Sequence, residues 1–476
     1  MIKIYNALKG TLEEFIPTIN GEVSMYVCGP TVYNYIHIGN ARPVIFFDTV
    51  RRYFEYKGYK VKYVSNFTDV DDKMINKANE EGITLKEVAD KYISAFLEDT
   101  GKLNLKEEGM IRPKATEHIG EMIKIIKELE AKGFAYMSQG DVYFNVEKYE
   151  NYAELSHQKI EDLISGSRID VNEQKKNPLD FTLWKASKEG EPSWGSPWGQ
   201  GRPGWHIECS AMSKKFLGDT FDIHGGGQDL IFPHHENEIA QSKCAHEGEY
   251  ARYWMHNGYI NIKGEKMSKS LGNFTLLRDI LKSYEGRIIR FFMLSSHYRK
   301  PIDFSDEELN MAKSAIERIE NTLSRINDVI KNISPISIDS KHNINILLDD
   351  TKNKIELAMN DDFNTAKAMG GIFELVKDLN KIMDSQTFSQ NDLDSLKFSY
   401  EFIENIITNV FGVLLNTEAK LDGTLSEELL DLILNLRLEI KKEKNYTLAD
   451  SIRDSLAKLG IEIKDGKDKT TWILKK

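Results

Sequence analysis

The distribution of proline, glycine and histidine divides the chain near residue 305. Ten of the 11 prolines, 26 of the 32 glycines and ten of the 11 histidines precede that point. Proline and glycine interrupt helices and mark turns, so a segment that lacks them favours long helices. The composition therefore predicts alternating strands and helices with many turns in the first part, and mostly helix in the second.

The second part opens with a long apolar stripe. Ser305 and Glu308 form a capping-box pattern, and Pro335 ends the periodic segment. Between them, apolar residues recur every three or four positions, at 309, 312, 316, 319, 323, 326, 330 and 333. This spacing predicts a helix of about 29 residues. A coiled-coil dimer would bury the stripe, but helical patterns near residues 346–359, 363–384 and 394–412 favour a bundle within one chain.

The first part begins with a strand, a helix and a second strand. Glu22–Cys28 is an apolar strand candidate, Arg42–Lys57 has apolar residues at helical spacing, and Val61–Phe67 is the next strand. This order predicts a parallel sheet with right-handed crossovers. Lys175–Gly204 looks irregular and is rich in tryptophan, which fits either a functional loop or an insertion packed onto the sheet.

Charge and cysteine content exclude several classes of protein. The net charge of −11 argues against a general nucleic-acid coat, although the last 56 residues carry 11 acidic and 11 basic side chains and end in the lysine-rich segment Lys464–Lys476. Three cysteines are too few for a disulfide-stapled secreted protein, and the apolar runs are too short to cross a membrane. We expect a soluble cytoplasmic protein that does not bind membranes.

A glycine-rich turn after the first strand predicts an anion site. Gly29–Asn40 lies between that strand and the following helix, where backbone N–H groups and the helix dipole attract phosphate. His37 and Asn40 are three residues apart at the helix entrance, and both could donate hydrogen bonds to phosphate oxygens. The sequence His-Ile-Gly recurs at His118–Gly120. That copy lies inside a predicted helix, so we expect a core or surface role for it.

A second basic motif lies some 230 residues later. Lys266–Ser270 reads Lys-Met-Ser-Lys-Ser and is flanked by Gly264 and Gly272. Two lysines on a glycine-bounded loop could swing onto a polyphosphate and offset charge in a transition state. A basic pentapeptide alone usually forms a solvated turn, so the prediction depends on its pairing with the His37 segment.

Four residues form a candidate metal site. Cys28 ends the first strand, Cys209 lies in the segment Trp205–Ser210, and His234 and Glu238 share one helix face at i and i+4. Two thiolates, one imidazole and one carboxylate suit tetrahedral zinc. From spacing alone, His235 or Cys244 could substitute, and buried cysteines are often plain core residues. From spacing alone, a metal site is therefore one of several interpretations of these residues.

The motifs together resemble those of a known family. His37–Asn40 and Lys266–Ser270 resemble the two signature motifs of the class I aminoacyl-tRNA synthetases, with asparagine in place of the last histidine of the first motif. That departure keeps a hydrogen-bond donor at Asn40 and removes a titratable ring. The set Cys28, Trp205–Ser210 and Phe232–Glu238 resembles the cysteinyl-tRNA synthetase family, as do Phe67–Lys73, Asp180–Lys185, His224–Leu230, Asp361–Ala366 and Leu448–Arg453.

The resemblance implies an activity and a set of site residues. It implies that L-cysteine and ATP form cysteinyl-adenylate and that the cysteinyl group then passes to tRNA(Cys). It implies one Zn2+ per chain held by Cys28, Cys209, His234 and Glu238, without Cys244, and Mg2+ bound with ATP. The remaining roles that it implies are ATP binding by His37, Asn40, Gly226, Gly227, Asp229 and Lys269, catalysis by His37, Asn40, Lys266 and Lys269, and amino-acid binding by Thr68 and Trp205.

The expected architecture is α/β with three parts. Residues 1–304 would form a Rossmann-like catalytic domain with an insertion at about 120–200 and a motif-bearing loop region at about 225–304. Residues 305–420 would form a helical bundle, and residues 421–476 a small tRNA anticodon-binding domain in a monomer. Two other functions stay open: a cysteine ligase of thiol biosynthesis that acts on an amino sugar, and a non-catalytic tRNA-binding paralogue with structural zinc.

Overall fold

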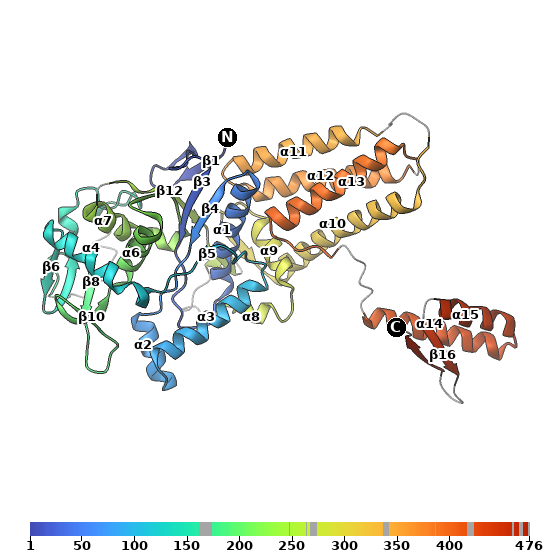
Figure 1. The fold of residues 1–476 in the computed structure, drawn as a ribbon, viewed down its shortest axis with the longest axis horizontal. Helices are drawn as coiled ribbons and strands as arrows, with labels where there is room; N and C mark the ends of the chain where they lie inside the picture. The colour runs from blue at the N-terminus through green and yellow to red at the C-terminus, as the bar shows by residue number, and fades with distance from the viewer. Residues whose placement is uncertain are drawn as a thin grey trace. The chain divides into compact units, whose positions relative to one another are not determined.

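A parallel sheet forms the centre of the first part of the chain (Figure 1). The computed structural model describes residues 1–160, 174–246, 248–262, 264–266, 274–336, 342–385, 387–416, 423–458, 461–465 and 470–474. The sheet contains β3 (Glu22–Val27), β4 (Lys60–Val64), β5 (Met110–Ile111), β11 (Thr220–Gly227) and β12 (Tyr250–Asn257). Their order is β12-β11-β3-β4-β5, and every neighbouring pair is parallel. The α/β fold with a Rossmann-like parallel sheet is therefore confirmed.

The strand order creates a crevice at one point of the sheet. The chain adds β4 and β5 on one side of β3, and then β11 and β12 on its other side. Connections leave β3 and β11 in opposite directions, so a switch point lies at the carboxyl ends of these two strands. In open parallel sheets, ligands bind at this kind of point.

Helices follow the strands as the periodicity predicts, with shifted boundaries. α1 (Ile38–Tyr56) begins four residues before Arg42, because the side chain of Asn40 accepts a hydrogen bond from the backbone N–H of His37 and so starts the first turn earlier. α2 (Asp72–Glu81) follows β4. α3 (Leu85–Gly101) opens with a capping box between Thr84 and Glu87.

The segment between β5 and β11 carries an antiparallel sheet. α4 (Ile119–Ala131) is followed by β6 (Ala135–Ser138), β7 (Asp141–Phe144), β8 (Phe181–Ala186), β9 (Trp194–Ser196) and β10 (Gly199–Pro203). The strands are ordered β6-β7-β8-β10-β9. Thr116 does not cap α4, because its hydroxyl donates to Asp69 at 2.5 Å and a 3-10 turn (Ala115–His118) precedes the helix.

The tryptophan-rich segment is more regular than its composition indicates. Three strands, β8, β9 and β10, lie within Lys175–Gly204. A Cβ at Gly201 would lie 2.3 Å from Nε1 of Trp184, and one at Gly204 would lie 2.0 Å from the carbonyl of Thr182. The glycines therefore permit close strand packing here. Trp184 is fully buried, so for this residue the packing role fits.

The long helix and its partners form a bundle. α10 spans Asp306–Asn332, 27 residues, and Ser305 accepts a hydrogen bond from the N–H of Glu308. It packs against α9 (Gly286–Leu294), α12 (Thr365–Met383) and α13 (Gln390–Glu404), and α11 (Ile344–Asn360) packs on α12. The stripe residues Leu309, Ile316, Ile319, Leu323 and Ile326 are buried by these contacts. The apolar stripe of α10 is thus buried by helices of the same chain.

The chain divides into two compact units, Met1–Leu415 and Asn416–Lys476. The sheet and the bundle lie together in the first unit, so the composition change near residue 305 does not mark a break in packing. The second unit contains α14 (Gly423–Lys442), α15 (Tyr446–Lys458) and the antiparallel pair β16 (Ile461–Asp465) and β17 (Thr470–Leu474). Among the described residues, no helix is both long and apolar enough to cross a membrane.

Candidate active site

The candidate site lies at the switch point of the parallel sheet. Cys28 directly follows β3, and its backbone N–H donates to the carbonyl of Gly225 near the end of β11. A Cβ at Gly225 would lie 2.4 Å from the ring of Phe47, so only glycine lets α1 pack this closely on the strand. α6 (Trp205–Leu217) carries Cys209, α7 (Glu236–Ala245) carries Glu238, and the short helical turn Ile231–His235 before α7 carries His234.

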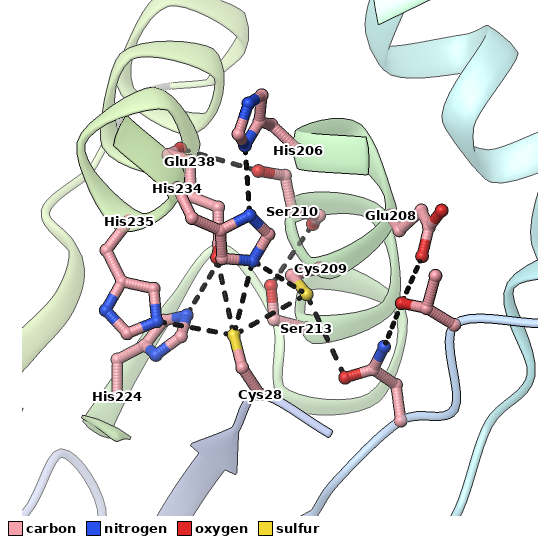
Figure 2. Close-up of polar contacts among 12 residues, drawn as sticks. Cys28, His206, Glu208, Cys209, Ser210, Ser213, His224, His234, His235 and Glu238 are labelled. Carbon is pink, nitrogen blue, oxygen red and sulfur yellow. Dashed lines mark hydrogen bonds and ion pairs between the residues drawn. The ribbon is translucent and has the colours of Figure 1, made fainter. Parts of the chain in front are cut away.

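Four of the predicted ligands converge in the structure, as Figure 2 shows. The Sγ atom of Cys28 lies 3.6 Å from Sγ of Cys209, 3.5 Å from Nε2 of His234 and 3.5 Å from Oε1 of Glu238. Sγ of Cys209 lies 3.6 Å from Nε2 of His234, and this nitrogen lies 2.9 Å from Oε1 of Glu238. Cys209, His234 and Glu238 are buried, and Cys28 is half-buried.

These separations fit a tetrahedral zinc ion. Zinc binds sulfur at about 2.3 Å and nitrogen or oxygen at about 2.0–2.2 Å, so neighbouring ligands of a tetrahedral site lie about 3.3–3.8 Å apart. Four of the five distances fall in that range. The fifth, between His234 and Glu238, is the length of a hydrogen bond. The donor set and its spacing thus fit zinc.

A second overlapping set of donors lies beside the first. It combines Cys28 and Glu238 with His224 and His235. His224 faces the other carboxylate oxygen, with Nε2 2.8 Å from Oε2 of Glu238, and His235 Nε2 lies 3.3 Å from Sγ of Cys28. Among the described residues, neither set includes Cys244, whose thiol pKa is raised to about 12 chiefly by burial. Of the two residues that could substitute for a predicted metal ligand, His235 lies within ligand distance of the cluster and Cys244 does not.

Further side chains hold the candidate ligands in place. Nδ1 of His206 lies 2.9 Å from Nδ1 of His234, and the ring of Trp205 stacks on His234 at 4.2 Å. The hydroxyl of Tyr250 donates to Oε2 of Glu238 at 2.8 Å. Partners of this kind fix the tautomer and orientation of metal ligands. Neither His206 nor Tyr250 was a sequence prediction.

The electrostatics of the cluster favour a cation. Burial, with Cys209 and Glu238 acting in the same direction, raises the pKa of the Cys28 thiol. Burial also opposes ionisation of Cys209, but hydrogen bonds from Cys28 and His234 outweigh it and lower this pKa to about 6. Burial likewise disfavours the charged form of Glu238, yet His224 and His234 hold its pKa well below the usual value. Buried negative charge of this kind needs a positive partner.

Residues 275–277, which follow the Lys266–Ser270 motif in the chain, contact the turn that carries His37. His37 precedes α1 and forms an antiparallel bridge with Leu276, while Ile38 N–H donates to the carbonyl of Thr275 and Leu277 N–H to that of Ile36. The chain that leaves the Lys266–Ser270 motif therefore passes directly beside His37. Lys266 belongs to β14 (Glu265–Lys266), and its side chain lies outside the described residues, as does all of Lys269.

The second His-Ile-Gly copy has a different setting. His118 is 5% exposed, its Nδ1 lies 2.8 Å from the carbonyl of Lys114, and its ring packs beside Phe216. It is a core residue, as its position inside a predicted helix indicates.

The candidate nucleotide residues are the last two residues of β11, Gly226 and Gly227, and Asp229 just after the strand. A Cβ at Gly226 would lie 2.9 Å from Cε1 of His235, and one at Gly227 would lie 2.4 Å from Oδ1 of Asp229. Side chains at these positions would displace His235 and Asp229. Packing against the buried ring of His235 therefore favours glycine at position 226, whereas the exposed side chain of Asp229 could move aside from a Cβ at position 227.

Thr68 and Trp205 each contact a residue close to the candidate ligands. Thr68 is 2% exposed, and its hydroxyl donates to Oε2 of Glu208 at 2.7 Å. Trp205 is 40% exposed above the ring of His234. Glu208 was not singled out from the sequence. Placing Trp205, Glu208 and Cys209 on one helix face at i, i+3 and i+4 would have drawn attention to it.

Comparisons with known proteins agree with this arrangement. The profile described as the tRNA synthetases class I (C) catalytic domain matches residues 14–314, and that of the DALR domain matches residues 354–416. A curated cysteine–tRNA ligase from Fusobacterium nucleatum is 64% identical over 476 residues, 100% of both chains. The chain belongs to the cysteine–tRNA ligase family of class I tRNA synthetases. The cysteine–tRNA ligase from Carboxydothermus hydrogenoformans is 52% identical over 94% of both chains.

Solved structures of class I synthetases share the fold. The methionyl-tRNA synthetase of Mycobacterium tuberculosis, in complex with methionyl-adenylate, has a TM-score of 0.62 at 17% identity, with 82% of this chain and 90% of that chain covered. The likeness concerns the fold alone at this identity. The candidate site of this family member therefore rests on its own geometry.

Proposed function

We propose that this protein is a cysteine–tRNA ligase. In this reaction L-cysteine and ATP form cysteinyl-adenylate, and the cysteinyl group then passes to the 3′ end of tRNA(Cys) for translation. The observation that carries the proposal is the convergence of Cys28, Cys209, His234 and Glu238 at the switch point of a class I synthetase sheet. The full-length relatives named cysteine–tRNA ligase support the same substrate.

We assign these four residues to one zinc ion per chain. Two thiolates make this set softer than the alternative with His224 and His235, which offers one sulfur ligand. When bound, zinc supplies a Lewis acid that prefers sulfur to oxygen, which selects a thiol side chain over a hydroxyl. A pocket shaped only by packing discriminates weakly between such isosteres.

The first half-reaction needs positioning and charge stabilisation. A carboxylate oxygen of cysteine attacks the α-phosphorus of ATP, the bond to the leaving oxygen breaks, and pyrophosphate departs. The imidazole of His37 and Nδ2 of Asn40 would donate to phosphate oxygens, since Oδ1 of Asn40 already accepts the N–H of His37. Lys266 and Lys269 would offset the charge that develops on the leaving pyrophosphate, with Mg2+ bound to ATP.

The remaining contacts follow from the position of each residue. Gly226, Gly227 and Asp229 would lie against the nucleotide at the end of β11, and Thr68 and Trp205 against the amino acid. In the second half-reaction a 2′- or 3′-hydroxyl of the terminal adenosine attacks the cysteinyl carbonyl, and AMP leaves. No covalent enzyme intermediate is required, so orientation supplies most of the rate enhancement.

Assembly and location follow from simpler features. We propose a monomer, because the apolar stripe of α10 is buried within its own chain. We propose a cytoplasmic location, because Cys28, Cys209 and Cys244 are free thiols, which a reducing compartment maintains. The amino-sugar ligase and the non-catalytic paralogue are not favoured, since the curated cysteine–tRNA ligase relatives match over the full chain.

One assay tests the proposal. Purified full-length protein should catalyse ATP–pyrophosphate exchange that depends on L-cysteine and not on L-serine, and should transfer labelled cysteine to tRNA(Cys). Exchange with cysteine but transfer only to an amino sugar would identify the thiol-biosynthesis ligase instead. Absence of exchange from protein that contains zinc would leave the non-catalytic paralogue.

A further inference from the structure

One fully buried arginine near the start of α1 has no assigned role. Arg42 lies two residues after Asn40, and its side chain is 1% exposed. Within the described part of the chain no carboxylate pairs with it, and its Nε is buried without a hydrogen-bond partner. Burial lowers its pKa to about 10, so the side chain stays charged at neutral pH. A buried cation without an anion is often less stabilising than an apolar side chain of similar size, so stability alone does not account for Arg42.

The two terminal nitrogens of Arg42 bind two other segments of the chain. Nη1 donates to the carbonyl of Tyr259 at 2.7 Å, and Nη2 donates to the carbonyl of Lys300 at 2.5 Å. Hydrogen bonds from a charged donor are stronger than those between neutral groups, and the planar guanidinium fixes both acceptors in one geometry. Arg42 therefore holds both segments firmly against α1.

Both segments lead into strands beside the second signature motif. β13 (Ile260–Ile262) begins directly after Tyr259 and pairs with β14, the short strand that contains Lys266. β15 (Ile302–Phe304) begins two residues after Lys300 and pairs with the other edge of β13. Arg42 thus connects the helix that follows His37 with the strands that carry the backbone of Lys266.

The chain that follows the motif is attached to the same helix. Leu276 forms the bridge with His37, and the N–H of Ile38 donates to the carbonyl of Thr275. The segment before the motif is held by Arg42, and the segment after it by these backbone contacts. The start of α1 is therefore the common attachment point for both ends of the motif.

We propose that Arg42 is a positioning residue for adenylate formation, which fixes the separation between the His37–Asn40 turn and Lys266. It acts through its hold on Tyr259 and Lys300 and does not touch the substrate. Groups that stabilise charge in a transition state must be aligned beforehand, so a small displacement lowers the rate more than the affinity for substrate. The inference rests on the proposed function, in which both motifs contact the phosphates of ATP.

A second arginine of α1 provides a matched control. Arg51 is 3% exposed, and like Arg42 it donates from both terminal nitrogens to backbone carbonyls, those of Lys106 and Glu108. These two residues precede β5 and belong to neither signature motif. If Arg42 only stabilised the fold, the two arginines would respond alike to the same substitution.

Replacement by lysine keeps the charge and removes the two-pronged contact. Arg42→Lys should lower the turnover number of cysteine-dependent ATP–pyrophosphate exchange about 10- to 100-fold, with the KM for cysteine and the zinc content within about twofold of wild type. Arg51→Lys should leave the turnover number within about twofold, although its melting temperature falls. Exchange kinetics, zinc content and thermal unfolding are measured on the full-length zinc-loaded protein.

A double-variant cycle tests whether Arg42 acts through Lys266. In the Lys266→Ala background, Arg42→Lys should lower the remaining turnover number less than about threefold, because the charge that it positions is already absent. Arg51→Lys should have the same small effect in both backgrounds. Full additivity of Arg42→Lys and Lys266→Ala would contradict the positioning role.

Other outcomes would also overturn the proposal. They are equal losses of turnover in Arg42→Lys and Arg51→Lys, or an unchanged turnover number with a raised KM for ATP in Arg42→Lys. Should Arg42→Lys fail to fold, Arg42→Gln, which keeps two N–H donors, takes its place with the same expected results. Wild-type protein without cysteine-dependent exchange would contradict the proposed function, whereas matching Arg42 and Arg51 variants of an active enzyme would contradict only the positioning role.

Discussion

The sulfur atoms of Cys28 and Cys209 lie 3.6 Å apart and form no disulfide bond. A disulfide would require an S–S distance of about 2.05 Å. The observed separation is instead that of two sulfur ligands bound to one zinc ion. His234 and Glu238 complete the sphere from α7 and the turn before it. Selectivity for sulfur thus depends on a few individual atoms, each of which can be tested by replacement.

Replacing one sulfur should remove the metal. We expect Cys209→Ser to lower bound zinc from about one per chain to near zero, because a hydroxyl is a poor ligand for this ion. Zinc content and cysteine affinity measured on the same sample test this. Cys244→Ser, which changes a buried cysteine outside both donor sets, is the control and should keep its zinc. Retained metal and cysteine affinity in Cys209→Ser would contradict the assignment.

The two copies of His-Ile-Gly provide a natural comparison. His37→Ala should lower the turnover number of pyrophosphate exchange about 10²- to 10³-fold with a smaller change in the KM for cysteine, since the donor acts on charge in the transition state. His118→Ala should lower the melting temperature instead, because it removes a buried ring from the core. Exchange kinetics and thermal unfolding of both variants test the contrast, and equal kinetic losses would contradict it.

Sequence reasoning finds residues with rare side-chain chemistry more easily than their partners. Cys28, Cys209 and His234 stand out because cysteine and histidine in helical spacing suggest metal binding. Glu208 does not stand out, because the contact that places it beside the site is with Thr68, which lies 140 positions away in the chain. The choice between His234 and His235 also required distances, since both are buried neighbours in one turn.

Helices α1 and α9 are joined by a buried ion pair between Asp48 and Arg290. Arg52 also donates to Asp48 at 2.7 Å, and Arg290 donates to the carbonyls of Phe411 and Leu103. Burial opposes the charge on Asp48, but Arg290 and Arg52 outweigh it and lower the pKa of this carboxyl. The network connects α1, α9 and the end of the bundle.

Removing this carboxylate should destabilise the first unit strongly. Asp48→Asn leaves Arg290 buried without its anion, and we expect a loss of about 3–5 kcal/mol in the free energy of unfolding at pH 7. The folded pKa of Asp48 lies below its unfolded value, so its contribution is complete above the unfolded pKa and is lost as the pH falls through the folded pKa. Urea unfolding should therefore show a difference from wild type that is constant from pH 7 to about pH 4 and narrows below it.

An exposed ion pair supplies the control for this experiment. Asp90→Asn breaks a surface contact with Lys86 and should cost less than about 1 kcal/mol. A similar small effect of Asp48→Asn would mean that the buried network contributes little to stability.

Regular periodicity made some elements predictable and others not. The stripe that ends at Pro335 predicted α10 almost to the residue. The strands β8 to β10 were missed, because Gly201 and Gly204 suggest turns in the sequence but serve close strand packing in the structure. A glycine alone does not reveal whether it frees the backbone or admits a neighbour.

At the scale of the whole chain, composition and packing divide the molecule at different places. The composition changes near residue 305, whereas the boundary between the two compact units lies between Leu415 and Asn416. Asp362 explains part of the difference, because this loop residue between α11 and α12 accepts hydrogen bonds from Tyr5, Tyr298 and Arg299 of the first part. Such contacts depend on tertiary structure and have no pattern in the sequence.

The second unit allows the two half-reactions to be separated. All described candidate residues for adenylation lie in the first unit, which contains two large hydrophobic clusters of its own. Truncation after Leu415 should therefore leave cysteine-dependent pyrophosphate exchange within about twofold of the full chain and preserve the unfolding transition of the first unit. Transfer of cysteine to tRNA should fall more than about tenfold, because the proposed tRNA-binding unit is absent.

Salt dependence distinguishes a docking role from a merely stabilising one. Lys464, of which only the backbone is described, and Lys467, Lys469, Lys475 and Lys476, which lie outside the described residues, would contact phosphates. The affinity of the full chain for tRNA should then fall as salt rises, with a steeper slope than that of the truncated chain, because each lost phosphate contact removes released counterions. Both half-reactions and both slopes are measured on folded samples of the two chains. If the second unit only stabilised the first, exchange and transfer would fall together and the slopes would match, and that result would exclude tRNA docking by residues 416–476.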